Sequence, residues 1–161
     1  MVESDAISWH APDAAHPARL ASQRSAAAVA RGDRQGWLEL FAPDGVVEDP
    51  VGPSMFDAEG KGHHGHDGIG AFWDTAIAGV RRFHFTITDS FANGEECANV
   101  GTISTVLHDG TRVDTEGVFV YRVGEDGLIR SMRAHWEPDR AMATARPHEP
   151  YEGDLPASRN P

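Results

Sequence analysis

The chain has 161 residues, of which 40% are hydrophobic and 24% charged, and its formal net charge is −11. This length suits a single domain, and this charge repels phosphate groups, so nucleic acids and anionic membrane surfaces are not expected partners. The sequence lacks a run of about 18 apolar residues, so no membrane span is expected. The acidic first ten residues do not resemble a signal peptide, and the single cysteine, Cys97, suits a reducing compartment, which predicts a cytoplasmic protein.

Proline and polar residues at both ends of the chain predict two loose segments around one folded body. Pro12 and Pro17 interrupt the first stretch, and we expect a flexible arm over residues 1–17. The last stretch, RPHEPYEGDLPASRNP, is polar and rich in proline, so a flexible tail is expected over residues 144–161. The folded domain is therefore predicted to cover residues 18–143.

Three helices are predicted in the first half of this domain. Residues 18–31 are rich in alanine with apolar residues at helical spacing, and Gly32 is suited to end that helix. Asp33 is suited to cap a second, short helix over residues 34–41. A third helix is predicted over residues 67–78, because its apolar side chains recur on one helical face.

Strand patterns surround and follow the third helix. VVEDP is predicted to form a short strand that Pro50 stops, and residues 51–66, rich in Gly, His and Pro, are expected to form a loop. After Gly79, alternating segments separated by Asp-Gly turns predict a meander of four strands. Three helices on one face of a curved antiparallel sheet make an α+β cone, in which the uncovered part of the concave face is a deep apolar pocket.

The segment EDPVG, residues 48–52, ends the first short strand and carries a family resemblance. Together with the final hairpin, VYRVGEDGLIRSMRAHW, and the helical segment GIGAFWDTAIA, it resembles the delta-5-3-ketosteroid isomerases of the nuclear-transport-factor-2-like (SnoaL-like) fold. The resemblance spans residues 21–136, with a longer loop over residues 53–66. It implies an apolar, steroid-like ligand, no cofactor, no metal, and a homodimer formed through the outer face of the sheet.

The resemblance places the general base of the family at Asp49. In that family the base takes a proton from the carbon beside a ketone and returns it two carbons away. An exposed aspartate has a pKa of about 4, and an apolar pocket raises it, which makes the carboxylate a better base. A carboxylate that moves one proton needs no cofactor. Without its motif, an aspartate beside a proline would be interpreted as a strand-end cap.

The hydrogen-bond donors of the family's oxyanion site are not matched in this sequence. The resemblance places the oxyanion tyrosine at Ser25 and the protonated aspartate at Phe119, and the two supporting tyrosines at Phe41 and Trp73. These four residues and Trp136 are expected to bind the ligand. One lost donor typically costs about 2.7–4 kcal/mol in the transition state, so other donors are needed for efficient proton removal.

Four other residues are candidates for the missing donors. On the same correspondence, Thr102 and Ser104 are inward positions of one strand, while Tyr121 and His135 lie on neighbouring strands. Phe119 and Tyr121 are two residues apart and therefore share a face. Tyr121 and His135 are the predicted catalytic donors. The alternative interpretations are a core aromatic residue for Tyr121 and a packed or surface residue for His135.

The loop with His63, His64 and His66 invites a zinc interpretation that its composition does not favour. Zinc needs three or four converging ligands, and a Gly-His loop without a partnered cysteine is a poor cage. The stretch EGKGHHG lacks the ending of a phosphate loop, and no Gly-x-Ser-x-Gly motif occurs. The histidines are expected to be solvated and no metal site is predicted.

Three functions are consistent with these residues. The leading hypothesis is a steroid isomerase in which Asp49 moves the proton. A hydroxysteroid dehydratase would begin with the same proton removal and then expel hydroxide, with His135 or Tyr121 as the proton donor. A non-catalytic steroid-binding protein is favoured by the loss of both oxyanion donors. A carboxylate buried in an apolar pocket argues against that third function, because burying it is costly.

Overall fold

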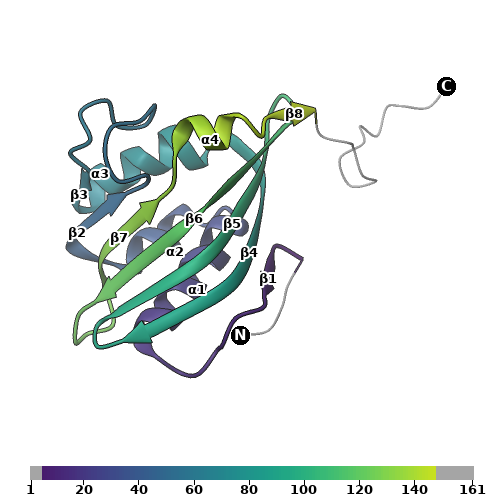
Figure 1. The fold of residues 1–161 in the computed structure, drawn as a ribbon. Coiled ribbons are helices and arrows are strands. Elements are labelled where there is room, and N and C mark those ends of the chain that lie inside the picture. The colour runs from purple at the N-terminus through teal and green to yellow at the C-terminus, as the bar shows by residue number, and fades with distance from the viewer. Residues whose placement is uncertain (1–4, 148–161) are drawn as a thin grey trace.

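A curved, unclosed sheet forms the frame of the molecule in the computed structural model, which describes residues 5–147 (Figure 1). The strand order is β1-β4-β5-β6-β7-β2-β3, and β8 pairs with β6. Strands β4 to β7 form the predicted antiparallel meander, whereas β1 pairs with β4 and β2 with β7 in parallel. The strands are β1 (Ile7–Trp9), β2 (Phe41–Glu48), β3 (His63–His64), β4 (Val80–Asn93), β5 (Glu96–Leu107), β6 (Thr111–Val123), β7 (Ile129–His135) and β8 (Arg146–Pro147).

The helices lie on one face of the sheet and at one of its ends. Figure 1 shows α1 and α2 behind the sheet and α4 across one end of it. Two residues mark the boundary between α1 and α2. The side chain of Asp33, just before α2, accepts a hydrogen bond from Gly36 N at 2.9 Å. Gly32, just after α1, has a positive φ of 69°. The helical elements are α1 (Pro17–Ala30), α2 (Arg34–Glu39), α3 (Gly65–Phe72), the π-helical turn η1 (Trp73–Ile77) and α4 (Pro138–Met142).

Five short elements differ from the sequence prediction. Strand β1 lies inside the expected N-terminal arm, where Ile7 is buried and pairs with Phe85. Strand β3 lies inside the expected loop, η1 replaces the last turns of the third helix, and α4 with β8 extends the chain beyond the last predicted strand. Elements of two to five residues are too short for a periodic pattern to predict them. Residues 148–161, most of the expected tail, lie outside the described residues.

The hydrophobic core occupies the closed side of the cone around Trp37. Its indole ring lies 4.9 Å from the ring of Phe41 and 5.3 Å from that of Trp73, measured between centroids. Val47 and Ile129 complete the core from the sheet. Between residues 5 and 147, no helix is long and apolar enough to cross a membrane. The core fills one end of the concave face and leaves the other end open for a pocket.

Candidate active site

An apolar cavity of about 510 Å³ lies between the concave face of the sheet, α3, η1 and α4. This volume is in the range of small-molecule sites. Its walls include Phe72, Ile77, Phe83, Leu107, Val113 and Met142. Asp49 is the one ionisable side chain among the described residues that line it. The cavity therefore combines an apolar wall with a single carboxylate.

Parallel pairing of two strands brings Asp49 to Trp136. Asp49 follows β2 directly and Trp136 follows β7, and the carboxyl ends of parallel strands meet at one edge of a sheet. The Trp136 Nε1–H donates a hydrogen bond of 2.6 Å to Asp49 Oδ1. Burial raises the pKa of Asp49 to about 6, against the smaller lowering effect of the Trp136 hydrogen bond. The pKa of Asp49 therefore lies much closer to neutrality than that of an exposed aspartate.

Ser25 is part of a buried hydrogen-bonded group with Trp37 and Tyr121. Its Oγ accepts a hydrogen bond of 3.0 Å from Trp37 Nε1 and one of 3.2 Å from the Tyr121 hydroxyl. Burial raises the pKa of Tyr121 to about 12, the Ser25 hydrogen bond lowers it, and the charge of Asp49 adds a further rise. The Tyr121 hydroxyl thus stays neutral. Ser25 does more than fill space in α1, because it fixes two aromatic side chains.

Phe119 and Tyr121 lie together, as their spacing on β6 predicts. Both are buried and line a small space that also touches Ile103, which is shared with the Asp49 cavity. Phe41 and Trp73, expected to bind the ligand, instead pack against Trp37 in the core and do not line the Asp49 cavity. The Trp37 ring of α2 contacts both rings, and all three side chains are buried in the core.

The expected placement of Thr102 and Ser104 must be corrected. The cavity is lined from β5 by Ile103 and Thr105, so Thr102 and Ser104 project from the opposite face of the strand. Ser104 lies opposite Asp114 on β6 and contributes to lowering the pKa of that carboxyl group. An offset of one residue moves every side chain of a strand to the other face.

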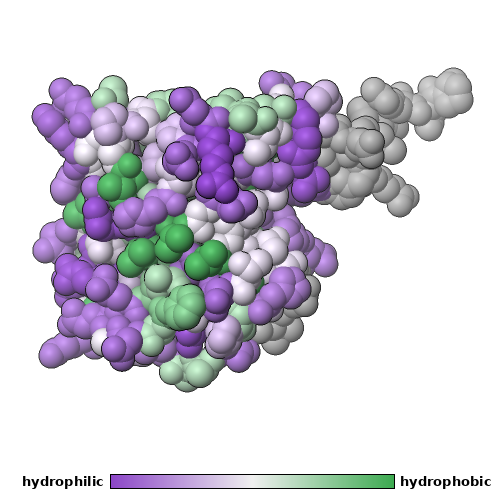
Figure 2. Space-filling view, in the orientation of Figure 1, coloured by the Kyte–Doolittle hydropathy of each residue, from purple (hydrophilic) through white to green (hydrophobic). Residues whose placement is uncertain are grey.

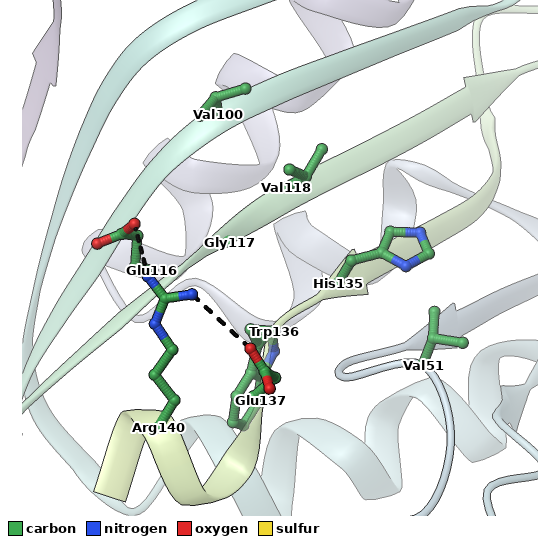
Figure 3. Close-up of a pocket in the computed structure, with 9 residues that line it drawn as sticks. All are labelled: Val51, Val100, Glu116, Gly117, Val118, His135, Trp136, Glu137 and Arg140. Carbon is green, nitrogen blue, oxygen red and sulfur yellow. Dashed lines mark hydrogen bonds and ion pairs between the residues drawn. The ribbon is translucent and has the colours of Figure 1, made fainter. Parts of the chain in front are cut away.

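His135 is also corrected, because it lies on the outer face of the sheet. Its side chain is exposed and lines a surface hollow of about 500 Å³ beside Val118 and Val51. Figure 3 shows its ring at the end of β7, with the ion pairs of Arg140 to Glu116 and Glu137 across the hollow. His135 therefore does not face the Asp49 cavity and cannot donate a proton to a ligand there.

The three histidines of the loop make hydrogen bonds and ring contacts with neighbouring residues. His64 Nε2 is hydrogen-bonded to the carbonyl of Lys61 at 2.7 Å, and His66 Nε2 to the carbonyl of Phe41 at 2.9 Å. The His63 ring lies 4.9 Å from that of Phe72. In the part of the chain that the structure describes, no three metal-ligating side chains converge. The loop thus supports the wall of the cavity.

Several cavity residues were missed by sequence reasoning. Met55 and Phe56 come from the loop after β2, and Ala141 and Met142 come from α4. The loop has no periodic pattern, so its sequence carries no signal for them. Pro138 at the start of α4 was the available signal for a short helix.

Comparison with known proteins gives three findings. Residues 22–132 match the model of the SnoaL-like domain. Epoxide hydrolase LasB of Streptomyces lasalocidi is 32% identical over 123 residues, which cover 74% of this chain and 41% of that protein, so the chain spans about two fifths of its curated relative. The structure of RV0760c from Mycobacterium tuberculosis in complex with estradiol-17beta-hemisuccinate is 37% identical, with a TM-score of 0.73 over 82% of this chain and 99% of that chain.

A second solved structure has the same degree of likeness. The Delta 5-3-ketosteroid isomerase from Mycobacterium sp. is 36% identical to this chain, with a TM-score of 0.73 over 82% of this chain and 98% of that one. The likeness in sequence and in structure therefore covers most of the fold described above.

Proposed function

Because the chain belongs to the SnoaL-like domain family, we propose that it is a cofactor-independent enzyme that moves a double bond in a steroid-like ligand, with Asp49 as the base. The observation that carries this proposal is a carboxyl group of pKa about 6 in an apolar cavity of about 510 Å³. The likeness to a ketosteroid isomerase and to a protein solved with an estradiol derivative supports the choice of ligand.

The reaction needs one proton to leave one carbon and return to another. At pH 7 Asp49 is mostly ionised and still basic, which suits general base catalysis. Trp136 binds Oδ1 and thereby orients the carboxylate, so that Oδ2 is the oxygen proposed to take the proton beside the ketone. The resulting dienolate takes the same proton back two carbons away. Substrate and product are isomers, so no other reactant is needed.

Tyr121 and Ser25 together are proposed to supply the donor for the enolate oxygen. The Trp37 indole can only donate, so Ser25 Oγ acts as an acceptor towards it. The hydroxyl groups of Ser25 and Tyr121 carry two protons, and one of these lies between the two oxygens. Because the Tyr121 hydroxyl donates to Ser25 Oγ, the proton of the Ser25 hydroxyl is the one left to donate to a ligand. The raised pKa of Tyr121 keeps its own proton in place for the bond to Ser25.

Replacement of the base tests this function. Asp49→Asn should lower turnover of a delta-5-3-ketosteroid by several orders of magnitude and leave ligand affinity within about tenfold, because only the proton transfer is removed. Absorbance of the enone product measures turnover. Asp44→Asn, which changes an exposed carboxylate on β2, is the matched control and should retain full activity. An Asp49→Asn protein with more than about a tenth of the wild-type rate would exclude the mechanism.

Binding without turnover is the second candidate function. It is favoured by Ser25 and Phe119, which stand where the resemblance requires stronger donors. The structure makes dehydration less favoured than the sequence alone did. His135 faces outward, so Tyr121 alone remains as the candidate donor to a leaving hydroxyl group. A panel of a delta-5-3-ketosteroid, a hydroxylated enone and a steroid epoxide separates these cases. Wild-type protein that binds all three and converts none would establish the binding function.

The outer face of the sheet is proposed to form a homodimer. Phe91 and Val118 are 62% and 36% exposed on this face. Figure 2 shows hydrophobic residues gathered in the middle of it, between hydrophilic ones. Exposed apolar patches of this kind mark interfaces between proteins, and closed two-fold pairs are the commonest oligomers.

A further inference from the structure

A small inner compartment adjoins the Asp49 cavity at Ile103, which contributes to the walls of both. Its volume is about 40 Å³. Apolar residues from β1, β4 and β6 form most of its wall, while Gln23 and Tyr121 are two of the polar residues that line it. The compartment therefore has two different hydrogen-bonding groups in a small apolar space.

Gln23 of this compartment has a buried polar atom without a hydrogen-bond partner among the described residues. It lies on α1 and is only 8% exposed, and its Nε2 is buried without a hydrogen-bond partner among residues 5–147. The neighbouring polar groups are already engaged, because Asn99 Nδ2 donates to Ser22 Oγ at 2.9 Å and Ser90 Oγ donates to Asn99 Oδ1 at 2.7 Å. A buried amide without a partner costs stability. An external acceptor would remove that cost.

The size of the compartment limits what it can accept. At about 40 Å³ the compartment is far smaller than the Asp49 cavity of about 510 Å³, so it has room for a small group at the tip of a larger ligand. The compartment is therefore the right size for one ketone or hydroxyl oxygen at the tip of a larger ligand.

The charge of the surroundings also favours a neutral oxygen. The nearby guanidinium of Arg19 is engaged by the Ser90 hydroxyl at 3.0 Å and the Ala14 carbonyl at 2.7 Å. Arg19 does not line the compartment, and its Nη2 also donates to the Ser90 carbonyl at 3.3 Å. The Tyr121 hydroxyl is neutral at physiological pH, because burial raises its pKa. Such a compartment offers neutral donors and little to balance an ionised group.

We propose that the inner compartment is a binding subsite for a single ketone or hydroxyl oxygen of an apolar ring ligand, to which the Gln23 amide donates beside Tyr121. The inference rests on the proposed function in one respect, the steroid-like nature of the ligand. It assigns Gln23 a role in ligand selection that the catalytic proposal for Asp49 does not include.

Saturated steroids test this subsite without any turnover. The probes are 5α-androstane, its 3-ketone and its 17-ketone, whose equilibrium affinities are measured by competition with a fluorescent steroid. Wild-type protein should bind one of the two ketones at least about tenfold more tightly than androstane, as a satisfied buried hydrogen bond allows. In Gln23→Met, which keeps the length of the side chain and removes its donor, this preference should fall to about twofold or less.

Two controls separate ligand binding from a structural role. Gln35→Met changes an exposed glutamine on α2 and should keep the wild-type preference. The melting temperature of ligand-free Gln23→Met should be equal to or above that of wild type, because the amide has no partner to lose. Gln23→Glu, which replaces donors by acceptors in the same shape, should bind the ketone more weakly than androstane.

Each outcome decides a different question. Equal ketone preference in wild type and Gln23→Met, or a lowered melting temperature of ligand-free Gln23→Met, would overturn the subsite. Equal affinity of wild type for all three steroids would overturn it as well, while the proposed function would stand. Wild-type protein that binds none of the three steroids would contradict the steroid-like ligand of the proposed function itself.

Discussion

Asp49 and Trp136 show how two contributions set the pKa of a carboxyl group in the cavity. Burial raises the pKa of Asp49 and the indole hydrogen bond lowers it, and burial has the larger effect. A group balanced in this way is sensitive to the loss of either contribution. Two consequences can be measured, one in the rate of the reaction and one in the stability of the fold.

The rate should rise with pH as Asp49 ionises. We expect kcat/KM for the ketosteroid to increase through a midpoint of about 6 and to reach a plateau above it, because the ionised carboxylate is the reactive form. Trp136→Phe removes the hydrogen bond that lowers this pKa, so the midpoint should move to higher pH. The pH–rate profile measures both. Trp9→Phe changes an indole that donates to the carbonyl of Pro12 and should leave the midpoint in place.

The same pKa predicts that Asp49 destabilises the fold near neutral pH. In the unfolded chain an aspartate ionises at about pH 4, whereas folded Asp49 does so at about 6. Between these values the folded protein binds the proton more tightly, so the free energy of unfolding falls as the pH rises, and it stays low above pH 6. Asp49→Asn should be more stable than wild type by about 1–3 kcal/mol at pH 7.5.

Urea unfolding at pH 7.5 and at pH 3 measures this difference. At pH 3, below both pKa values, the two proteins should have nearly equal stability. A stability gain of the same size at pH 3 would show that the carboxylate charge is not its cause.

At this scale the sequence could point to Asp49 but not to its surroundings. EDPVG singled out Asp49 as the candidate base because the motif is contiguous, and that role stays a prediction. The bond between Ser25 and Tyr121 joins residues 96 positions apart, and no local pattern reports such a contact. Thr102 and Ser104 were misplaced by one position in a count along the chain, although β5 itself pairs with β6 without any irregularity.

Among the elements, α4 closes the cavity and depends on Thr144 for its position. Thr144 Oγ1 accepts a hydrogen bond of 2.8 Å from Asp114 N on β6 and donates one of 2.7 Å to the Ala141 carbonyl. These bonds fix the end of α4 against the sheet. Because Ala141 and Met142 line the cavity, a change at Thr144 is expected to act on ligand binding.

Thr144→Val should therefore weaken ligand binding by about fivefold, the equivalent of one hydrogen bond of about 1 kcal/mol. The expected loss arises from a looser α4, although Thr144 itself does not line the cavity. A titration followed by tryptophan fluorescence measures the affinity. Thr88→Val removes an exposed hydroxyl that donates to the Val100 carbonyl and is the matched control. Unchanged affinity in Thr144→Val would show that α4 is held without this residue.

The elements that the sequence predicts well are those with long patterns. Helix α1 and the four strands of the meander are each long enough for a period to repeat, and their order was predicted correctly. The parallel pairing of β2 with β7 was not predicted, since strand order across a sheet depends on contacts far apart in the chain. That pairing is what brings Asp49 to Trp136.

At the scale of the molecule, the proposed homodimer makes a direct prediction. Wild-type protein should sediment as a dimer at micromolar concentration, with about 800 Å² buried per partner as in a standard interface. Val118→Lys places a charge in the exposed apolar face of the sheet and should yield monomers. Leu20→Lys changes an exposed apolar residue of α1 and should remain dimeric. A wild-type monomer at this concentration would contradict the dimer.

The alternation of side chains along β6 has a consequence for protein engineering. Val113, Thr115, Phe119 and Tyr121 face the ligand side, whereas Glu116 and Val118 face outward. Adjacent residues of β6 therefore lie on opposite faces of the sheet. A combinatorial library restricted to Val113, Thr115, Phe119 and Tyr121 would vary the walls of the proposed ligand site while leaving the proposed dimer surface intact. A library of Glu116 and Val118 would do the reverse, so that the two properties can be selected separately and then recombined in one gene.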